Sequence, residues 1–201
     1  MTDNREIVPT SPEPECVRPP VKWLQYLFCI RIAALVLSLT ALIPITLGVT
    51  TWLSHILTAG TAVCIYLLAA ASPRYRKAAI LTAVSLGLLV ISKLGLATLL
   101  SLAASIISII ANYQELYGHA ELVEQADAKL AGKWRSLFLW QILIGVLSGL
   151  ASTTATVIMV LADMDQSRII QLVTTAVLMV SLIPGILYVV YLRRTIRIFQ
   201  T

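Results

Sequence analysis

The residues best suited to chemistry lie together in one polar stretch of an otherwise apolar chain. Glu115 and His119 are four positions apart, and Glu121 and Glu124 follow closely. Residues four apart share one face of a helix, so these side chains could hold a metal ion together. The set has one His and no Cys, and Gly118 can interrupt a helix. The favoured interpretation is therefore a hydrated or hydrogen-bonded histidine, with no bound metal and no cofactor.

Arg31 is the other candidate, because it stands inside an apolar run. It follows Lys22 by nine residues, which is about 13 Å along a helix. An ionisable side chain at that depth either finds a partner or extends its charged end back toward the headgroups. The sequence favours the second arrangement for Arg31. Arg31, Glu115 and His119 are the candidate polar site.

Signatures of the common enzyme classes are absent from the sequence, which has no GxSxG, HExxH or CxxC and no glycine-rich phosphate loop. The three cysteines, Cys16, Cys29 and Cys64, are dispersed and suit packing better than disulfides. We therefore expect no catalytic residues and no enzymatic activity. The net charge of +5 comes from residues that flank the apolar runs, which favours attraction to anionic lipid and excludes nucleic acid as the expected partner.

Composition indicates which elements must position these residues. Hydrophobic residues make up 58% of the chain and charged residues 12%, with a mean hydropathy of +0.87; charged residues are about a quarter of a soluble domain. Apolar runs in a bilayer must be helices or barrel strands, because each backbone polar group needs a partner. Residues 32–39 and 78–91 lack the period-two alternation of a barrel strand. The predicted fold class is an all-α, polytopic transmembrane helical bundle.

The apolar runs predict six membrane spans, at about residues 23–48, 52–72, 77–92, 95–112, 136–162 and 169–192. Their number depends on residues 78–111, which as one helix would reach about 50 Å across a hydrocarbon core of about 30 Å. A break at residues 92–95, which include Lys93, divides this segment into two short spans. A re-entrant hairpin is the alternative.

The positions of the basic residues predict the orientation, because Lys and Arg in short loops stay on the cytoplasmic side. Six spans place all four basic clusters on one side: Arg18 and Lys22; Arg74, Arg76 and Lys77; Lys129, Lys133 and Arg135; Arg193, Arg194 and Arg197. We expect three hairpins in the plasma (inner) membrane, with both termini cytoplasmic. Residues 1–20 are rich in proline and charge and predict a disordered tail before a transmembrane domain at 21–201.

The polar connection between the second and third hairpins has two interpretations. A helix from about Ala120 could lie on the membrane surface, with an apolar face made of Leu116, Leu122, Val123 and Leu130. The same residues could instead extend the fourth span, with a turn at Gly132. The sequence leaves both open.

Small residues on two spans are typical of faces that pack closely against another helix. Gly145 and Gly149 form a GxxxG in the fifth span, and Ser101 and Ser105 belong to a small-residue stripe on the fourth. We expect both faces to pack within the chain, with oligomerisation as the alternative. The predicted partners are the lipid bilayer and either another membrane protein or a second copy of the chain.

The layout of spans and loops resembles that of uncharacterised bacterial multi-pass membrane proteins. The resemblance rests on Arg74-Tyr75-Arg76, on Lys133-Trp134-Arg135 and on the closing Tyr191-Leu192-Arg193-Arg194. It implies a topology and no activity.

Two functions remain from the sequence. The preferred one is a non-enzymatic subunit, assembly factor or regulator that acts through helix packing. The alternative is a small transporter or channel-forming subunit, which six spans would suit. Against transport stands the lack of a convergent polar site within the membrane.

Overall fold

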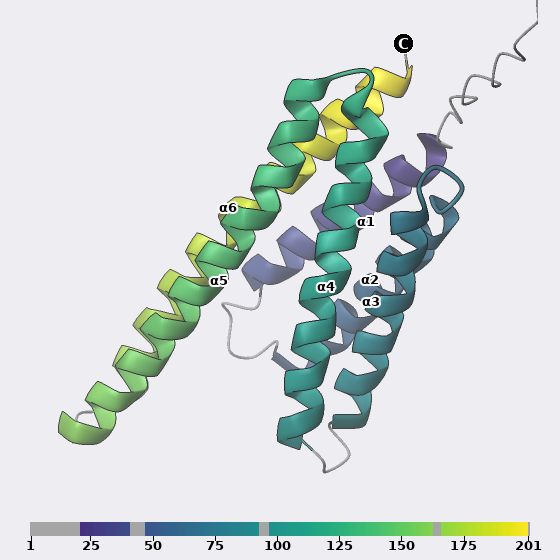
Figure 1. Ribbon diagram of the computed structural model, residues 1–201. Coiled ribbons are helices and arrows are strands. Elements are labelled where there is room, and N and C mark those ends of the chain that lie inside the picture. The colour runs from purple at the N-terminus through teal and green to yellow at the C-terminus, as the bar shows by residue number, and fades with distance from the viewer. Residues whose placement is uncertain (1–20, 41–46, 93–96, 163–165, 201) are drawn as a thin grey trace, which may run out of the picture.

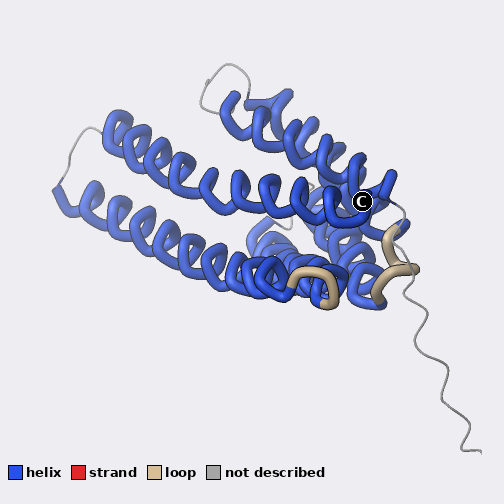
Figure 2. The backbone as a smooth tube through the Cα atoms, turned by 90° about the horizontal axis from the view of Figure 1, so that it is seen from above, coloured by secondary structure: helices blue, strands red, loops and turns tan. Residues whose placement is uncertain are grey.

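The computed structural model describes residues 21–40, 47–92, 97–162 and 166–200, which are helical except for two short turns (Figure 1). The six helices are α1 (Val21–Thr40), α2 (Leu47–Leu67), α3 (Pro73–Ser92), α4 (Ala97–Glu124), α5 (Ala128–Ala162) and α6 (Gln166–Gln200). The described residues contain no strand (Figure 2). Each of the six is long and apolar enough to cross a membrane, which confirms the predicted multi-pass, all-α fold class.

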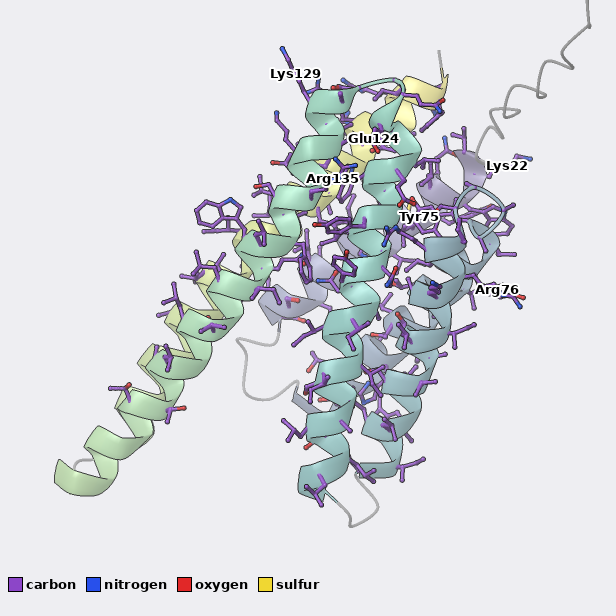
Figure 3. The ribbon with its side chains drawn as sticks, in the orientation of Figure 1. Lys22, Tyr75, Arg76, Glu124, Lys129 and Arg135 are labelled. Atoms are coloured by element: carbon purple, nitrogen blue, oxygen red, sulfur yellow. The ribbon has the colours of Figure 1, made fainter. Side chains whose placement is uncertain are left out.

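The helices pack in a ring. Each packs against the next one along the chain, and α1 also packs against α6. The turns at 68–72 and 125–127 lie at the same end of the bundle as the last residues of α6 (Figure 1). Lys22 and Lys129 lie at this end with their side chains pointing away from the bundle (Figure 3). We call it the basic end.

The bundle is tightly packed toward the basic end and more open toward the other. The largest fully buried side chains include Leu24, Tyr75, Leu116, Trp134 and Leu192, and they belong to one core cluster. Away from this core, α5 and α6 diverge together from α3 and α4 (Figure 1). Close packing therefore closes the ring near the basic end only.

The polar connection extends the fourth span, with its turn earlier than predicted. Helix α4 continues to Glu124 and α5 begins at Ala128, so the turn lies at 125–127 and Gly132 lies inside α5. Leu116, Val123 and Leu130 are fully buried, and the side chain of Leu122 packs against the same core. The membrane-surface helix is wrong because the predicted apolar face is covered by neighbouring helices. The extension of the fourth span is right, but its turn was placed too late.

The break between the third and fourth spans is borne out as a pair of separate helices, α3 and α4. Both are longer than predicted, because α3 begins at Pro73 and α4 ends at Glu124. At 1.5 Å per residue the 20 residues of α3 reach about 30 Å, which suits a full span. Lys93 and the tail at 1–20 lie outside the described residues.

Candidate functional site

A partly buried ion pair joins the first and fourth helices: the Glu115 side chain is 5% exposed and that of Arg31 is 29% exposed. Arg31 on α1 donates from Nη2 to Oε1 of Glu115 on α4 at 2.5 Å. Glu115 is only 4% exposed. Tyr188 on α6 donates its hydroxyl to the same Oε1 at 2.5 Å, and its ring faces the Arg31 guanidinium at 4.6 Å. Arg31 has therefore found a partner, and the interpretation that it extends back to the headgroups is wrong.

His119, one helical turn after Glu115, lies between two tyrosines. Its Nε2 is 2.9 Å from the hydroxyl of Tyr188, and its Nδ1 is 2.8 Å from the hydroxyl of Tyr75 on α3. Because Tyr188 gives its own proton to Glu115, the Tyr188 oxygen accepts from His119. This assigns the proton to Nε2, so Nδ1 accepts from Tyr75. The hydrogen-bonded histidine expected from the sequence is confirmed.

The four side chains form one directed hydrogen-bond chain, which we call the polar network: Tyr75, His119, Tyr188 and Glu115, with Arg31 as a second donor to Glu115. The hydroxyl protons of Tyr75 and Tyr188 and the ring proton of His119 each have an acceptor while His119 is neutral. Trp134 on α5 stacks on the His119 ring at 4.6 Å and donates to the Thr195 hydroxyl at 3.2 Å. Five helices thus meet at this network.

The shared-metal hypothesis fails because the other two carboxylates turn elsewhere. Glu121 accepts from Arg74 at 2.5 Å. Glu124 accepts from Arg135 at 2.8 Å, and Figure 3 labels these last two residues. Within the described part of the chain, no three His, Cys, Asp or Glu side chains are grouped as a metal site would require. Both carboxylates instead tie neighbouring helices together near the basic end.

The sequence suggested that Gly118 interrupts the helix. In the structure it instead makes room for the Tyr75 ring of the polar network. It lies inside α4, and a Cβ at this position would stand 3.1 Å from the nearest atom of the Tyr75 ring. The ring crosses α4 where a larger residue would collide with it. A glycine is therefore needed here for close approach rather than for a turn.

Two polar cavities adjoin Arg31. The first, of about 330 Å³, lies between α1 and α2. The second, of about 390 Å³, is bounded by Arg31 and by residues of α2, α3, α4 and α5. The polar side chains of the first include Arg31, Ser38, Ser54, His55, Thr58 and Thr61. Those of the second include Arg31, Thr58, Thr61, Thr82, Ser108, Asn112, Glu115 and Gln141. Three residues are common to both, so the cavities adjoin.

Two residues that line the first cavity each have one buried nitrogen without a hydrogen-bond partner among the described residues. Nε of Arg31 and Nε2 of His55 are both buried, and neither has a hydrogen-bond partner among the described residues. The hydroxyls of Ser38 and Thr58 donate to carbonyl groups of their own helices at 2.9 and 2.8 Å, which leaves their oxygens free to accept. Buried polar groups are normally paired. Arg31 and His55 thus each carry one nitrogen that is left unpaired among the described residues.

The predicted packing residues lie outside this site. Gly145 and Gly149 are exposed, and a Cβ added at either would meet no described atom within 4 Å. Ser105 is also exposed and donates to the carbonyl of Ser101 in its own helix at 2.9 Å. The close contact of α4 with α3 is made instead by buried Ala104, whose carbonyl accepts from Ser85 at 2.8 Å. The expectation that the GxxxG packs within the chain is not met.

Sequence reasoning missed the aromatic half of the polar network and the His55 side of the cavity. Tyr75, Trp134 and Tyr188 look like ordinary core or interfacial residues in a sequence. The available signal was the need of Arg31 and Glu115 for hydrogen-bond partners within an apolar chain. The sequence does not show which of the seven tyrosines supplies the hydrogen bond.

Searches against protein-family models, curated proteins and solved structures each found no match. The resemblance to bacterial multi-pass membrane proteins stays a prediction.

Proposed function

We propose that this protein is a small integral membrane transporter that binds a polar solute inside its ring of helices. The observation that carries this proposal is the pair of adjoining polar cavities beside Arg31 and Glu115. The sequence argument against transport was the lack of a convergent polar site, and such a site is present. Polar and ionisable groups within membrane spans are costly and commonly mark solute pathways.

The shape of the bundle supports transport over a purely structural role. The polar wall of the first cavity follows α2 from Thr50 to Thr61, a rise of about 16 Å. Toward the basic end the ring is closed by the core around Trp134 and Tyr75. A site between helices, with a packed barrier on one side, is the arrangement from which alternating access can begin.

The proposal includes an orientation. The basic end faces the cytoplasm of a plasma (inner) membrane, and the six spans form three hairpins with both termini cytoplasmic. Support comes from the exposed Lys22 and Lys129 at that end, because basic residues in short loops are retained in the cytoplasm. Lipid contacts the outer surface, where Ile56 and Leu139 are each 66% exposed. The protein is non-enzymatic.

A second candidate function is that of a subunit, assembly factor or regulator that acts through helix packing. The observation in its favour is the exposed GxxxG face at Gly145 and Gly149, which no described side chain covers. Such a face can admit a helix of another membrane protein or of a second copy. Replacing Gly145 with Leu should then release that partner from the purified complex, while transport by the cavity should not depend on it.

Transport is tested by filling the cavity in proteoliposomes. Thr58 lines both cavities, so Thr58→Trp should abolish uptake of the transported solute. The matched control is Ile56→Trp, two residues away on the lipid-facing side of α2, and it should leave uptake unchanged. We would measure uptake of labelled L-alanine, propionate, propylamine and glycerol, one solute for each charge class. If none enters faster than into empty liposomes, or if both variants behave alike, transport through this cavity is wrong.

A further inference from the structure

We propose that the second cavity binds a small uncharged polyol, a molecule that carries a hydroxyl group on each carbon. Its hydroxyls would hydrogen-bond to the charged side chains of Arg31 and Glu115 and to the carboxamides of Asn112 and Gln141, which all line this cavity. This inference rests on the proposed function, because it names the chemical class of the solute that one of the two cavities receives.

The ion pair still has hydrogen-bonding atoms to offer to the second cavity. Glu115 accepts from Arg31 and from Tyr188 through Oε1 alone, and Arg31 donates to it from Nη2. Oε2 of Glu115 and Nη1 of Arg31 have no partner among the described residues, and neither atom is fully buried. The second cavity is lined by both residues. A solute in this cavity can therefore reach one acceptor and one donor of the ion pair.

Asn112 and Gln141 add another acceptor and another donor. Asn112 on α4 donates from Nδ2 to Oε1 of Gln141 on α5. That bond leaves Oδ1 of Asn112 as an acceptor and Nε2 of Gln141 as a donor. Both side chains are half-buried and line the cavity, and neither of these two atoms is fully buried. The amide pair thus presents both kinds of hydrogen-bonding group to the same solute.

Threonine hydroxyls supply further acceptors to the wall of the second cavity. Thr82 on α3 donates to the carbonyl of Ala78, and Thr58 on α2 donates to that of Ser54, each at 2.8 Å. Because these protons are used within their own helices, the hydroxyl oxygens remain available as acceptors. The wall therefore has donors on α1 and α5 and acceptors on α2, α3 and α4.

This mixed wall and its balanced charge favour hydroxyl groups over ions. The charge of Arg31 is already offset by Glu115 at 2.5 Å. An anion or a cation would add an uncompensated charge, and a zwitterion would give up the hydration of two charges beside a pair that is already neutral. A hydroxyl group carries no charge and both donates and accepts. A chain of hydroxyls therefore matches this wall without adding charge to the membrane interior.

The size of the second cavity suits a short polyol. Its volume is about 390 Å³, near the lower limit of the usual range for ligand sites, about 300 to 1,000 Å³. Residues of five helices border it, from Arg31 on α1 to Gln141 on α5, so that a solute is surrounded on several sides. The apolar residues of the wall are Ile109 and Ala111 on α4, and they offer a contact for the carbon atoms of the polyol.

Equilibrium dialysis of the purified, detergent-solubilised full chain tests the chemical class. We would measure the binding of labelled xylitol and its displacement by unlabelled glycerol, L-alanine, propionate and propylamine. We expect saturable binding of xylitol that glycerol displaces and that the three charged molecules do not. No saturable binding of xylitol, or equal displacement by L-alanine, propionate or propylamine, would overturn the inference.

Two variants identify the second cavity as the site. Gln141→Leu removes the free donor and should weaken xylitol binding about tenfold. Thr82→Val removes one hydroxyl acceptor and should weaken binding about fivefold. Thr153→Val is the matched control, because Thr153 makes the same hydroxyl-to-carbonyl bond within its own helix at an exposed position of α5, and it should change nothing. Unaltered xylitol binding in Gln141→Leu would show that the polyol binds elsewhere.

The failures of the two proposals are distinguishable. If xylitol binds through Gln141 and is not taken up by proteoliposomes, the polyol site stands and transport is wrong. If L-alanine, propionate or propylamine is taken up and blocked by Thr58→Trp while xylitol does not bind, transport stands and the polyol inference is wrong.

Discussion

At the scale of single residues, the unusual feature is a pair of opposite charges within an apolar bundle. The carboxylate of Glu115 is shielded by Arg31, by Tyr188 and by the helices around them. A buried ion pair adds little stability over an apolar pair of the same shape, but removing one partner leaves a costly charge. Retaining such a pair is thus better explained by a polar site than by stability alone.

The carboxylates of Glu115 and Glu121 differ in exposure, so their replacement by alanine should have unequal effects on stability. Glu115→Ala should lower the free energy of unfolding by about 2 kcal/mol, because the buried Tyr188 hydroxyl and the partly buried Arg31 both lose the acceptor that they share. Glu121→Ala removes the partner of Arg74 at a site that is about one-third exposed, and it should cost less than about 1 kcal/mol. Unfolding in mixed micelles measures both. Equal losses would mean that the Arg31 site is as well solvated as the surface.

At the scale of helices, α4 is shaped by its contact with α3. The ring of Tyr75 lies against the backbone of α4 at Gly118 and is fixed there by its hydrogen bond to His119. Glycine has a low helix propensity, but at position 118 it allows α3 and α4 to approach closely. The sequence alone suggested a helix break at this glycine, because its propensity cost was visible and its contact was not.

Two Gly→Ala variants separate contact from propensity. Gly118→Ala should destabilise the protein by about 1 kcal/mol net, because three atoms of the Tyr75 ring lie 3.1 to 3.3 Å from the new Cβ. Gly87→Ala on α3 meets nothing within 4 Å, so it should stabilise by up to about 1 kcal/mol. Thermal unfolding in detergent reports both shifts. A gain at both positions would show that the Tyr75 ring moves freely.

The turn between α4 and α5 also depends on a local cap. Asp127 accepts from the backbone N–H of Leu130 at 2.9 Å and from Arg194 on α6 at 3.0 Å. The Leu130 N–H, more than any other group, holds the pKa of Asp127 below its usual range. The carboxylate therefore stabilises the start of α5 and its contact with α6.

A pH profile follows from the lowered pKa of Asp127. Its stabilising effect should be fully present above the usual pKa of an aspartate and should fade as pH falls through the lower value of the folded protein. Asp127→Asn should therefore melt at a lower temperature than the native protein near neutral pH, and the gap should narrow in acid. A gap that does not change with pH would assign the effect to shape rather than charge.

At the scale of the whole molecule, the ring is closed at one end and open toward the other. The core that closes it includes Leu24 of α1 and Leu192 of α6, so the first and last helices meet at the basic end. Toward the opposite end, α5 and α6 separate from α3 and α4 (Figure 1). The proposed orientation places the closed end in the cytoplasm.

Single cysteines measure this orientation. In a chain without its native cysteines, Lys129→Cys at the exposed start of α5 should react with an impermeant maleimide only after cells are permeabilised. Lys93→Cys, between α3 and α4, should react in intact cells. The reverse labelling pattern would show that the protein has the opposite orientation in the membrane, with the open end of the bundle facing the cytoplasm.

The sequence by itself determined that this is a multi-pass helical membrane protein, that Ser92 ends one helix, and that Arg31, Glu115 and His119 deserve examination. These are local properties, because apolar length and isolated charges can be read along the chain. Only the tertiary structure decided that the three residues meet. Arg31 and Glu115 are 84 positions apart and Tyr188 lies 73 beyond Glu115, so no spacing rule relates them. The cavity with its unpaired His55 is likewise a product of how α1 and α2 pack.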